Sequence, residues 1–528
     1  MPAVLFRTET ERTVMFCSIA SAAIYGIEAR IIKCEADCID GLPIFNMVGY
    51  LSSEVREAKD RVRTAIRNSG FFMKPKHVTV NLSPADIRKA GTAFDLPIAI
   101  AVMAASEMIP TDMFDNILLV GELGLDGEIK GISGVLPVVL AARDAGYKTC
   151  IVPKDNVMEG AVVDGIDCIG AETLESVVRY LFGSREDDMK PLKIDPESIF
   201  DEDRSEMNLD FYEVAGQPLA RRAVEIAVSG QHNILMSGPP GAGKTMIARR
   251  IPTIMPRLTF DESMELSRIY SVAGKLDKDR FFMTRRPFRS PHHTATVSSI
   301  VGGGVTPKPG EVSLAVSGVL FLDEMPEFNR EVIEALRGPL EDRTVMISRI
   351  NASYIYPARF MLAASMNPCP CGYYPDRNRC TCTDNMVRRY RGKISQPILD
   401  RIDLYINVDK INFSELNNER KNESSEAIRK RVERTLNIQK ERYRGLDICF
   451  NSQLSAGQIR KFCKLGDSEK TLLESAFDSI GLSARGYHRI LRVARTIADM
   501  DESDKISGSH IAEALGYREN MGTEEMRV

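Results

Sequence analysis

The chain has 528 residues, of which 44% are apolar and 27% are charged, a length and balance typical of a soluble protein with two to four domains. No run of eighteen uncharged apolar residues occurs, so the sequence predicts no membrane-spanning segment. The net charge of −4 argues against adhesion of the whole chain to nucleic acid, and eleven cysteines without a secretory signal indicate a cytoplasmic location.

The first third of the chain alternates between predicted strands and helices. Strands are predicted at 16–29, 77–82 and 116–123, and helices at 52–70 and 136–147. This alternation predicts an α/β domain over residues 15–183. Residues 1–14 are expected to be a non-native or disordered extension.

A charged, proline-containing stretch at 184–208 separates this domain from the rest of the chain, and it is predicted to be a solvated linker. Strand–helix alternation resumes over residues 209–408, which predicts a second α/β unit. The remainder, 409–528, is almost entirely helical in pattern and is expected to form a lid.

A glycine-rich loop follows an apolar strand and opens a helix in HNILMSGPPGAGKTMIARRI, residues 232–251. The pattern G-x-x-x-x-G-K-T lets backbone N–H groups wrap around phosphates at the start of a helix. Lys244 is expected to reach the β- and γ-phosphates of ATP, and Thr245 to help to hold Mg²⁺. The expected ATP-binding loop comprises Gly238, Pro239, Pro240, Gly241, Ala242, Gly243, Lys244 and Thr245.

An acidic pair ends the apolar strand GVLFLDE at 318–324, about eighty residues after the loop. Asp323 fits a Mg²⁺ ligand, and Glu324 fits a base that polarises the attacking water. An acidic pair at a strand end is often only a helix cap, but its spacing from the loop favours the catalytic interpretation.

Three more polar residues complete the predicted catalytic set. Asn367 ends another apolar strand, RFMLAASMN, where an amide can position the water. Arg401 is expected to act on the nucleotide of a neighbouring subunit, and Arg485, at the head of a lid helix, is expected to reach the γ-phosphate. For each arginine the alternative is a surface or intra-domain ion pair.

These motifs, in this order, resemble those of the AAA+ ATPases, and more narrowly the YifB/ComM family of magnesium-chelatase-like proteins. The similar text covers nearly the whole chain from about Met15 and includes VAGQPLARRAVEIAVSGQHNILMSGPPGAGKT, RPFRSPHHT, NPCPCG and SARGYHRILRVARTIAD. The resemblance implies an AAA+ P-loop α/β core, a C-terminal helical lid, ATP and Mg²⁺ as cofactors, and Gln217 as a further ATP contact.

The first domain resembles the proteolytic domain of Lon, a ribosomal protein S5 domain 2-like α/β fold, through GELGLDGEIKGISGVLPVVLAARDAGYKTCIVPKDN at 121–156. Lon requires a serine that is activated by a lysine. In the similar text Leu136 stands at the lysine position, and the serine position falls at or near Asp95, with Thr92 the nearest hydroxyl. The domain is therefore expected to be proteolytically inactive and to serve assembly or DNA contact.

Two insertions, around 280–313 and 341–360, resemble the helix-2 insert and the pre-sensor hairpin of related proteins. In those relatives the two elements line the pore of a hexamer. Basic residues in a pore can follow a phosphate backbone with little base preference, whereas solvated or inter-subunit charges are the alternative. The DNA-contact candidates are Arg285, Arg286, Arg289, Lys308 and Arg349.

The resemblance implies a hexameric DNA helicase that promotes branch migration in homologous recombination and natural transformation. Two alternatives remain: a chelatase-type remodeller of a protein complex, and a Lon-like ATP-dependent protease, which the missing lysine disfavours. The expected partners are DNA and further copies of the chain, with no membrane.

The stretch MNPCPCGYYPDRNRCTC, at 366–382, contains four cysteines that together span fourteen residues. Four thiolates can close around one tetrahedral Zn²⁺, and the turn-forming residues between the two pairs allow them to face each other. Free or redox-active thiols and unrelated core cysteines are the alternatives, and loss of zinc is expected to impair ring assembly before ATP binding. The zinc candidates are Cys369, Cys371, Cys380 and Cys382.

Overall fold

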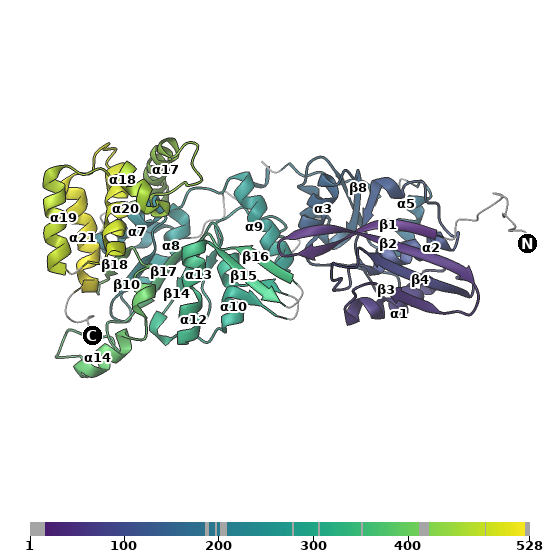
Figure 1. Cartoon of the computed structure of the whole chain (residues 1–528), viewed down its shortest axis with the longest axis horizontal. Coiled ribbons are helices and arrows are strands. Elements are labelled where there is room, and N and C mark those ends of the chain that lie inside the picture. The colour runs from purple at the N-terminus through teal and green to yellow at the C-terminus, as the bar shows by residue number, and fades with distance from the viewer. Residues whose placement is uncertain are drawn as a thin grey trace, which may run out of the picture. The chain divides into compact units, whose positions relative to one another are not determined.

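A computed structural model of the chain forms two units (Figure 1). The first unit holds the described residues up to Phe200 and those between Ser263 and Met283, and the second unit holds the others. The predicted extension at 1–14 and most of the predicted linker lie outside the described residues. The structure describes residues 16–184, 189–195, 198–200, 209–276, 279–304, 307–349, 352–410, 422–480 and 482–522.

The first unit is built on a seven-stranded mixed sheet of order β3-β4-β2-β1-β5-β8-β9. Antiparallel pairing joins β1 to β2 and β2 to β4, whereas β5, β8 and β9 continue the sheet in parallel. A short antiparallel hairpin, formed by β6 (Glu122–Leu123) and β7 (Ile129–Lys130), follows β5 in the chain. The sheet strands are β1 (Phe16–Tyr25), β2 (Glu28–Asp40), β3 (Phe45–Val48), β4 (Lys76–Ser83), β5 (Ile117–Leu119), β8 (Thr149–Pro153) and β9 (Asp167–Ala171).

The helices of the first unit bury their apolar faces against this sheet. In α1 the buried side chains recur every three or four residues, which gives one apolar stripe, whereas every residue of α2 is buried. Cys17, Cys34 and Cys38 belong to this core. The helices are α1 (Ser53–Asn68), α2 (Asp95–Ala105), α3 (Val135–Asp144), α4 (Val157–Ala161) and α5 (Leu174–Leu181).

Two segments outside the predicted first domain also belong to this unit. Met189, in the predicted linker, is buried, so the described part of that segment is not simply a solvated tether. Met264 and Phe282, which lie beyond the P-loop in the chain, join the core around α3. The predicted division into successive domains therefore differs from the structure at residues 263–283, which include most of α9 (Phe260–Ala273).

The second unit contains a five-stranded parallel sheet of order β11-β14-β17-β10-β18, which confirms the predicted α/β core. Its central strands are wholly buried, as their apolar runs predict. The edge strand β11 comes from the insertion before residue 313 and was not expected from the sequence. The strands are β11 (Phe288–Arg289), β14 (Val319–Leu322), β17 (Met361–Met366), β10 (Ile234–Ser237) and β18 (Leu404–Asn407).

The second unit also contains helices and two small hairpins, each of which is a separate two-stranded sheet. The hairpins are β12 (Gly302–Gly303) with β13 (Lys308–Pro309), and β15 (Thr344–Arg349) with β16 (Ala352–Pro357). The second of these hairpins was predicted from the sequence. The helices are α7 (Pro218–Gly230), α8 (Lys244–Ile254), α10 (Val297–Val301), α11 (Glu311–Leu314), α12 (Arg330–Ala335), α13 (Arg337–Asp342), α14 (Asp384–Arg391) and α15 (Gln396–Leu399).

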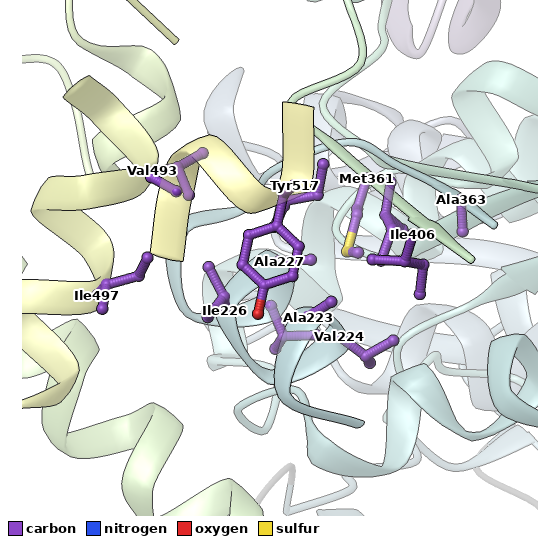
Figure 2. Close-up of a cluster of buried hydrophobic side chains, with 14 of the residues drawn as sticks. Ala223, Val224, Ile226, Ala227, Met361, Ala363, Ile406, Val493, Ile497 and Tyr517 are labelled. Atoms are coloured by element: carbon purple, nitrogen blue, oxygen red, sulfur yellow. The ribbon is translucent and has the colours of Figure 1, made fainter. Parts of the chain in front are cut away.

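The C-terminal segment is the helical lid that the sequence predicts, and its helices group together in Figure 1. Figure 2 shows part of the buried cluster that it shares with the core, in which Tyr517 is grouped with Ile226 and Ala227 of α7 and Met361 of β17. Among the described helices, none combines the length and apolar character needed to cross a bilayer. The lid helices are α17 (Ser425–Arg442), α18 (Ala456–Phe462), α19 (Asp467–Ile480), α20 (Ala484–Met500) and α21 (Gly508–Gly522).

Candidate nucleotide site

The glycine-rich loop joins β10 to α8 at the carboxyl edge of the parallel sheet. Gly241 and Gly243 have φ angles of +77° and +90°, and a Cβ atom on either would meet nothing within 4 Å. The loop therefore adopts a conformation that glycine favours and leaves open space in front of it. Gly238 is favoured for a different reason. A Cβ atom there would lie 2.2 Å from the carbonyl oxygen of Val408, so a larger residue would clash.

Lys244 is the first residue of α8, and its ammonium group is held by oxygen atoms. It donates to the carbonyl oxygens of Gly238 at 2.6 Å and Pro239 at 3.0 Å, and to Oδ1 of Asn367 at 3.2 Å. Burial lowers the pKa of Lys244, and the nearby Asp323 and Glu324 oppose that shift. The structure thus brings the predicted Lys244 and Asn367 together, with carbonyl partners that a phosphate can replace.

The acidic pair lies at the end of the neighbouring strand, beside the loop. Thr245 Oγ1 donates to Asp323 Oδ2 at 2.8 Å, so the two predicted Mg²⁺ ligands meet. Ser365 Oγ donates to Asp323 Oδ1 at 2.5 Å and accepts from the backbone N–H of Glu324 at 3.1 Å. Hard oxygen donors of this kind suit Mg²⁺, and Ser365 holds the carboxylate of Asp323 and the backbone of Glu324.

Ser365 is the functional residue that sequence reasoning missed. It is fully buried in β17, between Asn367 and a run of apolar residues. A hydroxyl inside an otherwise apolar strand needs a hydrogen-bond partner, and that isolated polar position was the available signal.

Gln217 precedes α7 in a left-handed conformation, with a φ angle of 56°. Its side-chain amide donates to the backbone oxygen of Asp409, at the end of β18. This hydrogen bond ties the start of α7 to the carboxyl edge of the sheet, where the glycine-rich loop also lies.

The two predicted arginines lie elsewhere. Arg401 precedes β18, at the amino edge of the sheet, where it pairs with Glu341 and donates to the carbonyl oxygen of Pro397 at 2.7 Å. Arg485 is exposed at the start of α20, and Arg489, one turn later, lies with Arg401 around a common cavity.

The four predicted zinc ligands converge in the loop after β17. Their sulfur atoms all lie within 4.8 Å of one another, with Cys369 3.3 Å from Cys371 and 3.8 Å from Cys380. A tetrahedron with Zn–S bonds of about 2.3 Å has sulfur–sulfur edges of about 3.8 Å, so the spacing fits zinc. The backbone N–H of Tyr374 points at the Cys369 sulfur at 3.4 Å, a contact typical of the surroundings of a metal-bound thiolate.

This cysteine loop also touches the nucleotide site. A Cβ atom on Gly372 would lie 2.5 Å from Pro240 of the glycine-rich loop, so the two loops are in direct contact. Tyr390, on α14, accepts a hydrogen bond from the backbone N–H of Asn367, and burial raises the pKa of its hydroxyl to about 12. Arg391 donates to the carbonyl oxygen of Pro368 at 3.1 Å.

The predicted DNA-contact residues differ in availability. Arg286 is nearly buried, pairs with Glu262 at 3.1 Å and donates to the carbonyl oxygen of Ser317 at 2.7 Å, so it serves the fold. Arg289 is bound by both carboxylate oxygens of Glu311, at 2.6 and 2.8 Å. The other three candidates are partly or fully exposed, and they are Arg285, Lys308 and Arg349.

The Lon-like positions of the first unit are occupied by structural residues. Asp95, the first residue of α2, forms two hydrogen bonds with Arg61, at 2.8 and 2.9 Å, and its side chain is 1% exposed. Thr92 donates to Glu122, and Leu136 is fully buried in α3. A leucine side chain cannot accept a proton, so this geometry contains no activated serine.

Three family models match successive parts of the chain. They are described as magnesium chelatase subunit ChlI, at residues 34–156 and 210–416, and its C-terminal part, at 422–518. The competence protein ComM of Haemophilus influenzae is 41% identical over 95% of this chain and 97% of its own. The uncharacterized protein YifB of Escherichia coli is 41% identical over 95% of this chain and 96% of its own.

A shorter similarity joins the chain to Lon protease 2 of Bacillus subtilis, which is 28% identical over 173 residues and 30% of each chain. The ComM and YifB similarities span both chains almost completely and include the site described above. The chain therefore belongs to the ComM/YifB family of magnesium-chelatase-like AAA+ proteins.

Proposed function

We propose that this protein is an ATP-hydrolysing, ring-forming DNA motor, acting as a hexameric helicase that promotes branch migration in homologous recombination and natural transformation. The ATPase part of this proposal is supported by the residues that meet at one edge of the sheet, which are Lys244, Asn367 and the Thr245–Asp323 pair. The full-length similarity to a protein named for competence supports the DNA part.

Each side chain at this edge has a distinct role in the proposed hydrolysis. Lys244 exchanges its carbonyl partners for the phosphates, and Thr245 and Asp323 hold Mg²⁺, which neutralises phosphate charge when bound. Glu324 accepts the proton of the attacking water, and Asn367 orients that water.

Arg401 completes the proposed site from another copy of the chain. It lies at the amino edge of the sheet, whereas the glycine-rich loop lies at the carboxyl edge, so it cannot act on the nucleotide of its own chain. Supply of an arginine across a subunit boundary stabilises charge on the transferring phosphoryl group. The arrangement supports a ring in which each subunit serves its neighbour.

DNA is proposed to contact the exposed basic residues Lys308 and Arg349, with Arg285 at the edge of the same insertion. Lys308 lies on the β12–β13 hairpin and Arg349 on the β15–β16 hairpin, and Arg349 donates to the carbonyl oxygen of Gly304 at 2.8 Å. That hydrogen bond brings the two hairpins together as one basic element.

Displacement of a strand from forked or three-stranded DNA tests the motor. The wild-type protein with ATP should displace the strand, and Glu324→Gln should bind the DNA without displacing it. If no strand is displaced and the rate of ATP turnover is the same with and without every DNA tested, the helicase assignment is wrong. Turnover that responds to a protein complex and not to DNA would support the chelatase-type remodeller instead.

We also propose a structural Zn²⁺ on Cys369, Cys371, Cys380 and Cys382, supported by their sulfur spacing. The contact of Gly372 with Pro240 links this loop to the glycine-rich loop, so metal loss should impair ring assembly first and should then also weaken nucleotide binding. Metal analysis should find about one zinc per chain, and a value below about 0.2 without exposure to chelator would count against the site.

A further inference from the structure

A basic surface surrounds the cysteine loop and α14 in the second unit. Residues 369–393, which we call the cysteine module, contain six arginine or lysine residues against two aspartates, whereas the whole chain has a net charge of −4. None of these six side chains has a role in the ATP hydrolysis proposed above. Figure 1 shows α14 at the periphery of this unit. A local excess of positive charge in an acidic chain indicates a surface for an anionic partner.

Three of the six basic side chains hold the module together or attach it to the sheet. Arg377 pairs with Asp384 at the start of α14, and Lys393 pairs with Glu327 at 3.2 Å. Arg391 donates to a backbone carbonyl oxygen at 3.1 Å. These contacts serve the fold, so the three residues are not offered as ligand-binding groups.

The other three basic side chains are exposed, and they belong to Arg379, Arg388 and Arg389. None of the three forms an ion pair with a carboxylate in the part of the chain that the structure describes. The dipole of α14 favours cations in its last turn, which accounts for Arg388 and Arg389 but not for Arg379 in the loop. Exposed cations without a carboxylate partner can bind an anion without breaking an existing pair.

Two consecutive tyrosine rings bring the loop and the helix together. The guanidinium carbons of Arg377 and Arg391 lie 5.0 and 5.1 Å from the centroid of the Tyr374 ring, and that of Arg379 lies 4.4 Å from the Tyr373 centroid. Arg377 and Arg379 come from the loop and Arg391 from the end of α14, so one basic surface includes both elements. Single-strand binders stack bases on aromatic rings, but these rings already bind guanidinium groups, which favours the backbone of a duplex as the ligand.

We propose that the cysteine module is a second DNA-binding surface, on which Arg379, Arg388 and Arg389 contact the phosphate backbone of duplex DNA. Guanidinium groups bind phosphate oxygens through paired donors, and such contacts position DNA without reading its sequence. The inference rests on the DNA motor proposed above, and it adds a surface to the two hairpins that carry Lys308 and Arg349.

The module is joined to the nucleotide site at two points. Gly372 contacts Pro240 of the glycine-rich loop, and Tyr390 accepts a hydrogen bond from the backbone N–H of Asn367. Tyr390 directly follows Arg389 on α14, so duplex DNA on the arginines acts on elements that surround the ATP phosphates. Binding of DNA to the module should therefore change the affinity for ATP, and ATP should change the affinity for DNA by the same factor.

The first test measures the salt dependence of duplex binding in Arg379→Gln/Arg388→Gln/Arg389→Gln, the module variant. Between about 50 and 200 mM salt, the slope of log affinity against log salt should become shallower by about 3, one for each lost contact. Affinity at the lower salt should fall at least about tenfold. Arg388→Gln/Arg389→Gln leaves the cysteine loop unchanged and should lose about 2 from the slope.

Two controls accompany this measurement. Lysine at all three positions keeps the charge and should keep most of the slope, because an ammonium group also binds phosphate. The matched control removes three exposed arginines of the lid and should bind duplex as the wild type does. This lid variant is Arg434→Gln/Arg444→Gln/Arg460→Gln.

Four results would overturn the inference. The first is an unchanged slope in both glutamine variants of the module. The second is a preference of the arginines for single-stranded DNA over duplex, and the third is equal competition by polyglutamate, which would indicate an acidic protein partner. The fourth is loss of rings in the module variant without DNA, which would assign the arginines to a contact between copies. Failure of the wild type to bind any DNA would instead overturn the proposed function.

The second test measures the coupling in the Glu324→Gln background, where ATP is bound but not hydrolysed. Saturating duplex should change the affinity for a fluorescent ATP analogue about fivefold or more. The same ratio should be close to one when the module variant is added to this background, and unchanged when the lid variant is added. An equal ratio with and without the three arginines, or no effect of duplex in Glu324→Gln alone, overturns the coupling.

Discussion

In each unit, one helix begins with a charged residue, and the charged side chain serves a different purpose in each unit. In the first unit α2 begins at Asp95, whose carboxylate accepts two hydrogen bonds from Arg61. In the second unit α8 begins at Lys244, whose partners are backbone carbonyls and one amide beside an open loop. A paired and buried charge supports a fold, whereas a charge with exchangeable partners can bind a ligand.

Replacement of Lys244 should have the largest effect. Lys244→Ala should abolish detectable nucleotide binding and lower ATP turnover about 10³-fold or more, because it removes the ammonium group that is proposed to bind the phosphates. Binding of a fluorescent ATP analogue and phosphate release measure the two effects. Lys440→Ala, at an exposed position of α17, is the control and should bind and turn over normally. Retained binding in Lys244→Ala would refute its role.

Glu324→Gln should separate binding from chemistry. We expect near-normal ATP affinity with turnover lowered about 10²- to 10³-fold, because the amide cannot accept the proton of the water. Glu327→Gln is the matched control, since Glu327 is part-exposed and pairs with Lys393 at 3.2 Å. Near-normal turnover in Glu324→Gln would show that another residue activates the water.

Ser365→Ala should have an intermediate effect. The change removes the hydrogen bonds to the carboxylate of Asp323 and to the backbone N–H of Glu324, so turnover should fall about tenfold while ATP affinity changes little. The free energy of unfolding should fall by only about 1 kcal/mol, as expected for one buried hydroxyl. A loss of turnover no larger than twofold would mean that the acids hold their positions without this hydroxyl.

Asp95→Ala should leave ATP turnover within twofold of the wild type. It removes the carboxylate from a buried pair, so the free energy of unfolding of the first unit should fall by about 3 kcal/mol. Asp112→Ala, at an exposed position, should leave both quantities unchanged. Casein cleavage by the wild type that Asp95→Ala or Thr92→Ala abolishes would instead reveal a working protease.

Elements with long, regular apolar patterns were predicted well. The alternation in HVTVNL corresponds to β4, and the helical stripe at 52–70 corresponds to α1. The residues of the glycine-rich loop, Asp323 and Asn367 also meet as expected, because parallel strands bring their carboxyl ends to one edge.

The features that were missed depend on tertiary contacts. The edge strand β11 has only two residues, too few for a periodic pattern, and pairs with a strand about thirty residues later. Arg489 lines a cavity with Arg401, one helical turn after the predicted Arg485, and motif spacing did not single it out. The membership of residues 263–283 in the first unit depends on contacts over more than a hundred residues.

That last feature bears on the order in which the chain folds during synthesis. The core around α3 requires Met264 and Phe282, and Ser271 donates a hydrogen bond to the buried Glu159. The first unit therefore cannot finish folding until the glycine-rich loop and α8 have already left the ribosome. A chain cut within the linker would leave that core incomplete and Glu159 without this partner, so the part before the linker is not a complete folding unit.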